Sequence, residues 1–586
     1  MALIARSGNG QGAQPDASLI IPVFNRGEAT RDLIEALQAD RSRAAFEVIA
    51  VDCGSSDGVA GWLTAQSAIV QLPAPGQTLS FAKAVNLAAQ QARGANLVLL
   101  HNDTLPEPGW LDALMEAVRS DAGIAVAGGK LLFPETRTVQ HAGLAVDSEG
   151  RIRHIYEHFT GDHPAVNKPR DFQAVSAALM LIRMVIFREF GGFNERFVNG
   201  LEEVDFCLRV RERGWRVVYE PRAVALHDTE PSRVEREFAR QNHQALSEIW
   251  RGKLTADCDK FYREDGFICR RGSRGEFLEP EGKDMQAMAG EARAALKEGN
   301  YEQALARYGE LDRLYPVDVN TIHYLALLHE RRRAWTEAAR LLKRLAALEP
   351  SAGVWTRLAQ ACLKMKDYER AGEYAARALG ATGYNSPIAA EALAIMGDAA
   401  FKSGRTGEAV THYQAAAAID GEQGRALTGL GTVELARQNY LAALPIFERL
   451  AARHPGHLRA ALGRGLCSLG LRDMGEAAKW LTAALELDPE NSGALAAALP
   501  LLSDAGKLEQ AHQLLERYLQ IYPDDHALAL AQAGVSFRLG YYDRCRALVA
   551  TIKDRHSDYP GVAELERELE RALSPTPRAV AAPAFA

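Results

Sequence analysis

The chain has 586 residues and a formal net charge of −7, with 47% hydrophobic and 24% charged residues. This length exceeds one ordinary domain, and the composition is typical of soluble globular proteins. The basic excess that accompanies nucleic-acid binding is missing, so we expect no nucleic-acid partner.

Cysteine usage and the chain start indicate a cellular compartment. The seven cysteines form no C-x-x-C pair, which fits a reducing compartment and argues against a disulfide framework or a zinc site. Residues 1–17 read as a flexible tail without the apolar segment of a signal peptide. The most apolar run, residues 174–187, is interrupted by Arg183 and is too short to span a bilayer. We therefore expect a cytoplasmic protein without a transmembrane segment.

Short apolar runs alternate with helical segments over the first hundred residues. The predicted strands cover residues 18–24, 46–51 and 97–100, and the predicted helices run to about residue 39 and over 79–93. Strands that alternate with helices predict an α/β domain with a mostly parallel sheet, whose ligands bind at the carboxyl ends of the strands.

Polar residues stand at the ends of these predicted strands. Asp52 and Asp103 lie at two of the strand ends, while Asn25 and Asp57 follow strands by one or a few residues. A single Asp after a strand is usually a turn former or an N-cap. Several polar clusters at one edge of one sheet make that interpretation less favoured and point to a ligand site.

Residues 199–227 carry a second concentration of polar side chains. Three acids, Glu202, Glu203 and Asp205, open an amphipathic helix that Gly214 ends, and a strand over 215–219 follows that Pro221 is expected to stop. Acids at the positive end of a helix are favoured by its macrodipole, which is one interpretation. The second interpretation is chemical: a carboxylate that accepts a proton, with His227 returning as a metal ligand.

These segments resemble glycosyltransferase family 2 over roughly residues 16–230. The resemblance rests on motifs in the family's order, namely PVFN (22–25), VDCGSSDG (51–58), FAKAVNLAAQQARG (81–94), LLHNDT (99–104), GWL (109–111), GGFNERF (191–197), EEVDFCLR (202–209) and GWRVVYEP (214–221). Residues 140–147 (QHAGLAVD) and 175–183 (VSAALMLIR) are similar to its rhamnosyltransferase-like branch. The resemblance implies a GT-A fold, a Rossmann-like mixed sheet, and inverting transfer from a UDP-, dTDP- or GDP-linked sugar.

The resemblance also implies roles for individual residues. Nucleotide contacts are expected from Pro22, Phe24, Asn25, Asp52, Ser55, Asp57, Lys83, Asn86 and Asn102. Among these, Asp52 is expected to bind the base. Asp103 and His227 are expected to hold a divalent cation, Mg²⁺ or Mn²⁺, because a diphosphate leaving group calls for a hard metal ion. Glu203 stands at the position of the catalytic base, which an attacking hydroxyl requires.

The chain departs from the family pattern at two positions. The metal motif reads His101-Asn102-Asp103, so its first carboxylate is missing and metal dependence is open. The base position holds Glu203 where Asp is usual, so the adjacent Glu202 competes for that role. A non-catalytic domain therefore stays an open interpretation. Two further histidines, His141 and His154, are interpreted as ordinary surface or core residues.

The second half of the chain repeats itself. Small residues recur at spacings of 34, 33, 38, 34, 34, 34 and 34, namely Ala304, Ala338, Ala371, Ala409, Ala443, Ala477, Ala511 and Cys545. A proline follows five of them by twelve residues, at 316, 350, 455, 489 and 523. This is the period of the tetratricopeptide repeat, and the 38-residue step predicts a loop insertion near residues 380–387. Stacked repeats predict a superhelix with a groove that holds a peptide or protein segment.

The expected organisation has five parts: a tail (1–17), a GT-A domain (18–250), a connection (251–283), about eight repeats (284–560), and a helix end with a disordered tail (561–586). We expect an inverting glycosyltransferase whose repeats recruit the acceptor, either a flagellin-like protein or a glycan. Two competing interpretations are a surface-polysaccharide enzyme with docking repeats and a non-catalytic, sugar-nucleotide-binding scaffold. Self-association through the repeats also stays open.

Overall fold

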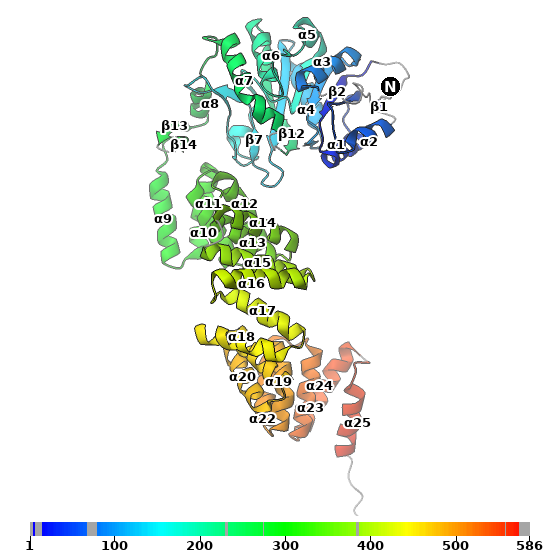
Figure 1. Ribbon diagram of the computed structural model, residues 1–586, viewed down its shortest axis with the longest axis vertical. Helices are drawn as coiled ribbons and strands as arrows, with labels where there is room; N and C mark the ends of the chain where they lie inside the picture. Colours follow the sequence, from blue (N-terminus) through cyan, green and yellow to red (C-terminus); the bar gives the residue numbers. More distant parts are fainter. Residues whose placement is uncertain are drawn as a thin grey trace, which may run out of the picture. The chain divides into compact units, whose positions relative to one another are not determined.

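The computed structural model describes residues 4–5, 14–66, 79–228, 233–272, 275–382, 386–556 and 558–573. The chain divides into two compact units, Met1–Pro350 and Ser351–Ala586. The first unit holds an α/β domain, a small hairpin and four helices of the repeats, and the second unit holds the remaining helices (Figure 1). The prediction of an α/β domain followed by helical repeats is confirmed.

A mixed sheet forms the centre of the first unit. Its described strands follow the order β1 (Ile4–Ala5), β3 (Phe46–Asp52), β2 (Ala17–Val23), β4 (Asn96–Leu100), β11 (Leu179–Arg183), β6 (Ile124–Leu132), β12 (Arg216–His227) and β10 (Arg170–Asp171). Strand β2 is parallel to β3 and β4, and β12 is parallel to β6, whereas β11 runs antiparallel between β4 and β6. Short strands β5 (Thr104–Pro106) and β7 (Val139–His141) pair with β12 and β6.

Helices cover both faces of this sheet (Figure 1). One face packs against α1 (Gly27–Ala39), α2 (Val59–Ala65) and α4 (Trp110–Ser120), and the other against α3 (Phe81–Gln91), α5 (Met184–Glu189), α6 (Glu202–Glu212) and α7 (Arg233–Trp250). Consecutive strand residues alternate between the two cores: Leu19 joins the first and Ile20 the second. The strands are therefore apolar on both sides, which is why they read as continuous apolar runs.

Strand β12 continues beyond Pro221, so the prediction that Pro221 stops this strand is wrong. The pairing of β12 with β6 shifts register between Glu220 and Val224. Proline lacks an N–H to donate, and it is tolerated at such an irregularity because no ladder hydrogen bond is needed there. The continued strand carries His227 to the sheet edge, where it pairs with Thr104 of β5.

Residues 251–272 and 275–283, which we expected to be a connection, form regular elements that belong to the first unit. They contain α8 (Cys258–Glu264) and a hairpin of β13 (Phe267–Gly272) and β14 (Gly275–Pro280). Phe261 and Phe267 are buried in the core behind the sheet, and Tyr315 of the following helices packs against the same core. The domain boundaries at 250 and 283 stay a prediction, but contacts run across both.

Eight helix pairs follow the hairpin within the described residues. In the first unit they are α9 (Met285–Lys297), α10 (Tyr301–Leu314), α11 (Val319–Arg331) and α12 (Trp335–Leu348). In the second unit they are α13 (Ala352–Lys364), α14 (Tyr368–Thr382), α15 (Pro387–Lys402), α16 (Thr406–Ile419), α17 (Gly424–Ala436), α18 (Tyr440–Arg453), α19 (Leu458–Gly470), α20 (Met474–Leu487), α21 (Ser492–Asp504), α22 (Leu508–Ile521), α23 (His526–Arg538) and α24 (Tyr542–Arg555). All eight repeating small residues lie in the second helix of a pair and are 0% exposed.

Small side chains let the paired helices approach closely. A Cβ atom on Gly431 or Gly463 would lie 2.6 or 2.5 Å from the ring of Phe447, so no larger residue fits without displacing that ring. The two helices that flank the 38-residue step are longer than their counterparts in the preceding repeats: α14 has 15 residues compared with 14 in α12, and α15 has 16 compared with 13 in α13. Residues 383–385 lie outside the described part of the chain.

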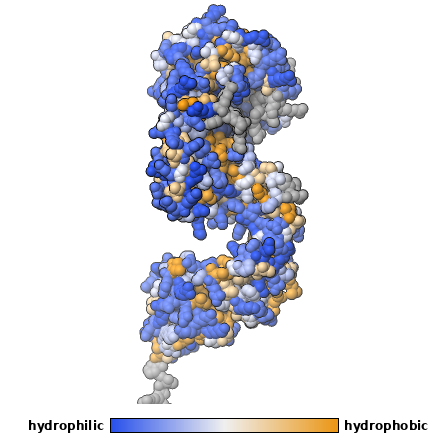
Figure 2. All heavy atoms as spheres, turned by 90° about the vertical axis from the view of Figure 1, so that its left-hand side faces the viewer, coloured by the Kyte–Doolittle hydropathy of each residue, from blue (hydrophilic) through white to orange (hydrophobic). Residues whose placement is uncertain are grey.

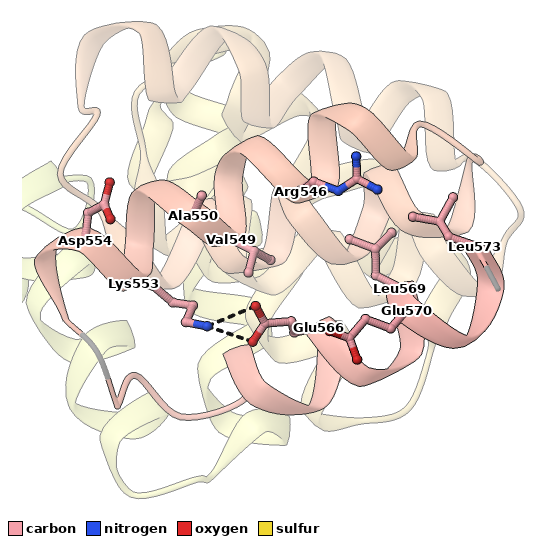
Figure 3. Close-up of a pocket in the computed structure, with 9 residues that line it drawn as sticks. All are labelled: Arg546, Val549, Ala550, Lys553, Asp554, Glu566, Leu569, Glu570 and Leu573. Atoms are coloured by element: carbon pink, nitrogen blue, oxygen red, sulfur yellow. Dashed lines mark hydrogen bonds and ion pairs between the residues drawn. The ribbon is translucent and has the colours of Figure 1, made fainter.

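Helix α25 (Val562–Leu573) packs on α24 at the end of the second unit (Figure 3). Val549 and Leu569 are buried between the two helices, and Lys553 Nζ lies 2.9 Å from a Glu566 carboxylate oxygen. A helix in this position covers the apolar face that the last repeat would otherwise expose. The tail expected over residues 574–586 lies outside the described residues.

On the face shown in Figure 2, hydrophilic residues predominate, and hydrophobic residues are scattered between them. In the part of the chain that the structure describes, we find no helix that combines the length and apolar character needed to cross a membrane. All seven cysteines are free thiols.

Candidate functional site

Two loops meet at the carboxyl ends of β2 and β3. The backbone N–H of Asn25 donates to Ser55 Oγ at 2.8 Å, and the backbone N–H of Ser56 donates to Asn25 Oδ1 at 2.8 Å. Asp57 Oδ2 accepts from the backbone N–H of Gly27 at 2.8 Å. Asn25 has a φ of 57°, a left-handed conformation that non-glycine residues adopt mainly in turns and at functional sites. The structure thus brings three of the expected nucleotide contacts together.

The other expected nucleotide contacts around these loops differ in how accessible their side chains are to a ligand. Asp52 closes β3, is 8% exposed, and accepts from the backbone N–H of Ser55 at 3.1 Å. Phe24 is 39% exposed, whereas Pro22 is buried inside β2. Asn102 donates to the Asn25 carbonyl oxygen at 2.9 Å, so its amide holds the loop in place. Asp52 and Phe24 are the better placed of these residues for ligand contact.

Helix α3 holds the other two expected nucleotide contacts. Lys83 is exposed in its first turn. Asn86 donates to the carbonyl oxygen of Phe193 at 2.9 Å and accepts from the backbone N–H of Phe193 at 2.8 Å. The amide of Asn86 therefore fixes the loop that precedes α6, and Lys83 is the residue whose side chain faces solvent.

Three side chains converge where β4, β5 and β12 meet. His227 Nε2 lies 3.2 Å from Asp103 Oδ1 and 3.2 Å from His101 Nδ1. One ligand atom from each of the three residues lies within 4.8 Å of the others. Burial, followed by the charge of His227, lowers the pKa of His101 to about 4, so its ring is neutral near pH 7. Burial alone would raise the pKa of Asp103, but the contact with His227 lowers it below its ordinary value.

Gln140 fixes the orientation of His227. The Gln140 amide donates to the carbonyl oxygen of His227 at 3.0 Å, so its own oxygen faces His227 Nδ1 at 2.6 Å. Nδ1 must then carry a proton, and Nε2 is directed at Asp103 Oδ1. In the tautomer without a second proton, Nε2 and Oδ1 are both acceptors. Two acceptors 3.2 Å apart call for a cation or a proton between them.

This donor set fits a divalent cation. It offers two imidazole nitrogens and one carboxylate oxygen, which suit Mn²⁺ or another first-row divalent ion better than Mg²⁺, which prefers oxygen. Asp103 and His227 were expected at this site, whereas His101 was expected only as a departure from the metal motif. Its imidazole stands where the family has a carboxylate.

Arg26 is a site residue that sequence reasoning missed. Its Nη1 lies 2.9 Å from Asp103 Oδ2 and 2.7 Å from the carbonyl oxygen of Asp228. Arg26 also has a positive φ, 55°. The only signal in the sequence was a basic residue directly after PVFN, and nothing local links it to Asp103.

A strained turn precedes the acids of α6. Asn199, Gly200 and Leu201 have φ values of 51°, 146° and 71°. Glu202 is 3% exposed, and its Oε2 accepts from the backbone N–H of Gly200 at 2.7 Å, whereas Glu203 is half-buried. The two adjacent acids therefore differ in environment, and Glu202 is engaged with its own turn.

Asp205 is paired with Arg209 and Trp250. Asp205 accepts from Arg209 Nε at 2.8 Å and from Trp250 Nε1 at 3.0 Å. The turn before α6 also contacts the start of α3, since Asn199 Oδ1 accepts from the backbone N–H of Phe81 at 2.7 Å. The ring of Phe81 lies 5.3 Å from that of His101, so α6 begins close to the three-residue cluster.

The fold is that of a mixed α/β domain joined to an array of helical repeats. Comparison with protein families agrees: residues 18–190 match glycosyl transferase family 2, and residues 323–386, 428–492 and 502–569 match tetratricopeptide repeats. The chain thus joins an N-terminal domain of glycosyl transferase family 2 to C-terminal tetratricopeptide repeats.

Curated relatives align with only part of the chain. An uncharacterized protein, y4gI of Sinorhizobium fredii, is 26% identical over 276 residues, 45% of this chain and 28% of the relative. The O-antigen biosynthesis protein RfbC of Myxococcus xanthus is 31% identical over 233 residues, 37% of this chain and 18% of the relative. An N-acetylglucosaminyl-diphospho-decaprenol L-rhamnosyltransferase of Mycobacterium tuberculosis is 27% identical over 202 residues, 31% of this chain and 66% of the relative. The chain therefore spans less than two thirds of each relative.

Proposed function

We propose that the chain is an inverting glycosyltransferase that moves a sugar from a nucleotide diphosphate sugar to an acceptor hydroxyl. The observation that carries the proposal is the convergence of His101, Asp103 and His227 beside the start of α6, within a domain of family 2. Such a cluster suits a metal-bound diphosphate, and the acids of α6 suit proton removal. The nucleotide is UDP, dTDP or GDP, with the two joined loops and Asp52 around it.

The chain's own residues account for most of the chemistry. Glu203 accepts the proton of the attacking hydroxyl, which attacks the anomeric carbon from the face opposite the leaving diphosphate. Asp52 accepts a hydrogen bond from the base. A divalent cation, when held by Asp103, His227 and His101, would neutralise charge on the leaving diphosphate. Arg26 adds a fixed positive charge on the other side of Asp103.

The repeats choose the acceptor in this proposal. Tetratricopeptide repeats commonly bind peptide segments in their groove, so we propose a protein acceptor, flagellin-like in kind. The names of two relatives, an O-antigen biosynthesis protein and a rhamnosyltransferase, favour a second candidate, transfer to a surface polysaccharide with the repeats docked to an assembly complex. The single carboxylate of the His101-Asn102-Asp103 motif favours a third, a sugar-nucleotide-binding scaffold without catalysis.

The first experiment is a thermal-shift screen of UDP, dTDP and GDP with and without Mn²⁺. A ligand at 100 times its dissociation constant adds about 2.7 kcal/mol of stability, which such a screen detects readily. Hydrolysis of the matching nucleotide sugar then separates an enzyme from a scaffold. If none of the nucleotides binds in the presence of Mn²⁺ or Mg²⁺, the proposed function is wrong.

A further inference from the structure

The first helices of the repeats and the hairpin before them enclose a cavity. Its volume is about 460 Å³, which is in the range of ligand-binding cavities, and its lining comes from β14, α9, α10 and α11. All of these elements belong to the first unit. Two of the lining residues, Leu278 and Tyr315, also pack against the core of the α/β domain, so the cavity lies where the repeats join that domain.

Tyr308 lines this cavity, and its hydroxyl has no hydrogen-bond partner among the described residues. The side chain is 1% exposed, and its ring stacks on that of Tyr324 with centroids 5.0 Å apart, so it offers no open face on which a sugar could stack. Burial raises the pKa of Tyr308 to about 12, so the hydroxyl keeps its proton near pH 7. An unpaired buried hydroxyl costs stability, and its presence therefore calls for an explanation.

The repeat itself does not require a hydroxyl at this position. Tyr308 follows the small residue Ala304 by four positions, and Phe447 follows Ala443 by four positions and is also 1% exposed. A ring without a hydroxyl therefore fills the same place between the paired helices of another repeat. Packing explains the ring of Tyr308 but not its hydroxyl.

Another repeat has a tyrosine at the same position, and there the hydroxyl has a partner. Tyr413, four positions after Ala409, donates to Asp398 Oδ1 at 2.7 Å. Arg425 Nη1 donates to the other oxygen, Asp398 Oδ2, at 2.8 Å. The carboxylate of Asp398 is thus held between a phenol and a guanidinium, and hydrogen bonds to a charged acceptor are among the strong ones.

In the first repeat, the position that corresponds to Asp398 holds an arginine. Asp398 precedes Tyr413 by fifteen positions, and Arg293 precedes Tyr308 by the same number. The loop between the paired helices has three residues in both repeats, so the two positions correspond in space. Arg293 lines the cavity, and a guanidinium only donates hydrogen bonds. The first repeat therefore presents two donors, where the other repeat has a donor and its acceptor.

Other polar residues of the lining limit the kind of ligand. Two acids line the cavity: Asp318 accepts from the backbone N–H of Thr321 at 2.9 Å, and Glu279 is exposed. Their negative charge disfavours a strongly acidic ligand. Gln286 and Asn320 are exposed, and a side-chain amide can pair with both the N–H and the C=O of a peptide group. The cavity thus fits a single carboxylate on an otherwise uncharged peptide.

We propose that this cavity binds the side-chain carboxylate of one Asp or Glu residue in a peptide segment, with Tyr308 and Arg293 as the donors that recognise it. The bound carboxylate takes the place that Asp398 has in the other repeat. Only the identity of the peptide, a segment of the protein acceptor, rests on the proposed function. One carboxylate supplies part of the affinity of a long segment, so the later repeats keep their part in acceptor choice.

The test measures peptide binding to the full chain by saturation-transfer NMR, without nucleotide or metal. The probe is a short acetylated and amidated peptide of Ala, Gly and Ser with a single Glu at its centre, and the comparison peptide has Gln there. The wild type should bind the Glu peptide at least about tenfold more tightly. Tyr308→Phe and Arg293→Gln should each reduce this preference to about threefold or less.

Thermal stability separates this role from a structural one. Tyr308→Phe removes an unpaired hydroxyl, so it should unfold at the same temperature as the wild type or at a higher one. Tyr413→Phe is the matched control: it takes a hydrogen bond from Asp398, so it should lower thermal stability and leave peptide affinity unchanged. A lower unfolding temperature of Tyr308→Phe would assign its hydroxyl to the fold and overturn the inference.

Three binding results would also overturn it. Equal affinity of the wild type for the Glu and Gln peptides would mean that the cavity does not recognise a carboxylate. Tighter binding of a Gln peptide with a free C-terminal carboxylate would assign the cavity to chain ends, and tighter binding of glucuronate would assign it to an acidic glycan. No sugar is transferred in these measurements, so failure of the proposed function would leave their outcome unchanged.

Discussion

Arg26 and His227 divide the two carboxylate oxygens of Asp103 between them. Arg26 Nη1 lies 2.9 Å from Oδ2, while His227 Nε2 lies 3.2 Å from Oδ1. A cation bound on the Oδ1 side would thus leave the Arg26 contact in place. In the proposed function, the guanidinium of Arg26 would supply part of the positive charge that a diphosphate needs.

We predict that Asp103 is required for the response to metal. Asp103→Asn keeps the size of the side chain but removes the charge that the cation and Arg26 share. Mn²⁺-stimulated hydrolysis of the nucleotide sugar should fall by about 10² or more, since electrostatic stabilisation of a leaving group is commonly worth this much. Mn²⁺ affinity, measured by calorimetry without nucleotide, should fall in parallel.

Asp228→Asn is the control for this change, because Asp228 also contacts Arg26 but its side chain is 68% exposed. It should leave turnover within about twofold, since exposed ion pairs contribute little. Wild-type activity that EDTA leaves unchanged would contradict a metal role for Asp103 and favour Arg26 as the principal cation.

Asp52 is predicted to bind the base of the nucleotide. Asp52→Asn should weaken nucleotide binding by about 1–3 kcal/mol, because a buried donor loses its charged acceptor. The measurement is the affinity for the nucleoside alone, which isolates the base from the phosphates. Asp57→Asn serves as a comparison, since Asp57 holds loop backbone and should mainly lower stability. Equal affinity of Asp52→Asn and wild type would remove Asp52 from the site.

The periodicity of the sequence predicted most of the architecture. Strand β2 is buried on both faces, so it could be predicted from a continuous apolar run in the sequence. The eight buried small residues of the repeats could be predicted from their regular spacing. Two features of the fold could not be predicted from the sequence. The continuation of β12 past Pro221 depends on a register shift against β6, and the burial of Phe267 depends on the core it meets. Both features depend on contacts with residues that are distant in the sequence.

The residues of the candidate site likewise fall into those that the sequence predicted and those that it did not. Asp103 and His227 stand at strand ends and could be assigned from motifs. Arg26 and Gln140 could not, because their partners lie 77 and 87 residues away in the chain. The environments that separate Glu202 from Glu203 also depend on backbone geometry, namely a turn with three consecutive positive φ values.

The repeats are predicted to govern acceptor choice and not the chemistry. The first two helix pairs belong to the first unit, which ends at Pro350, and Tyr315 packs on the core of the α/β domain. A truncation near Lys283 would therefore expose that core, and a chain ending after Pro350 is the better test. It should hydrolyse the nucleotide sugar at a rate close to that of the full chain but lose transfer to the native acceptor. Unchanged acceptor transfer would reduce the later repeats to a spacer or a self-association device.

Asp147 is predicted to make the hairpin that carries His154 sensitive to acid. Burial alone would raise the pKa of Asp147, but hydrogen bonds from Arg151, from Arg153 and from backbone N–H groups lower it from 3.8 to about 2. The unfolded chain then binds more protons than the folded chain between these values. The stabilisation is complete above about pH 4, amounts to about 2 kcal/mol, and is lost as the pH falls toward 2.

Asp147→Asn should remove this stabilisation at pH 7 and abolish its acid dependence, as measured by hydrogen exchange of the hairpin of β8 (Leu144–Val146) and β9 (Ile152–His154). Glu149→Gln, an exposed acid in the same turn, is the control and should change stability by less than about 0.5 kcal/mol. Equal protection of wild type and Asp147→Asn at pH 7 would contradict the assigned role.

Glu203 is predicted to be the catalytic base. Glu202 is buried and accepts from the backbone of its own turn, which favours the half-buried Glu203 as the acid that meets an acceptor hydroxyl. Glu203→Gln keeps the size of the side chain but cannot take a proton. It should lower turnover by about 10²–10⁴-fold and leave nucleotide affinity nearly unchanged, because the lost interaction belongs to the transition state.

Glu202→Gln is the matched control at the adjacent position. It weakens the hydrogen bond to Gly200, so it should lower thermal stability and change turnover less than Glu203→Gln. Glu203→Asp should retain partial activity, because it keeps a carboxylate one methylene further from the acceptor. If Glu202→Gln is inactive and Glu203→Gln is near wild type, the base is Glu202. If both variants stay active, the acids serve only the helix macrodipole, and neither of them is the catalytic base.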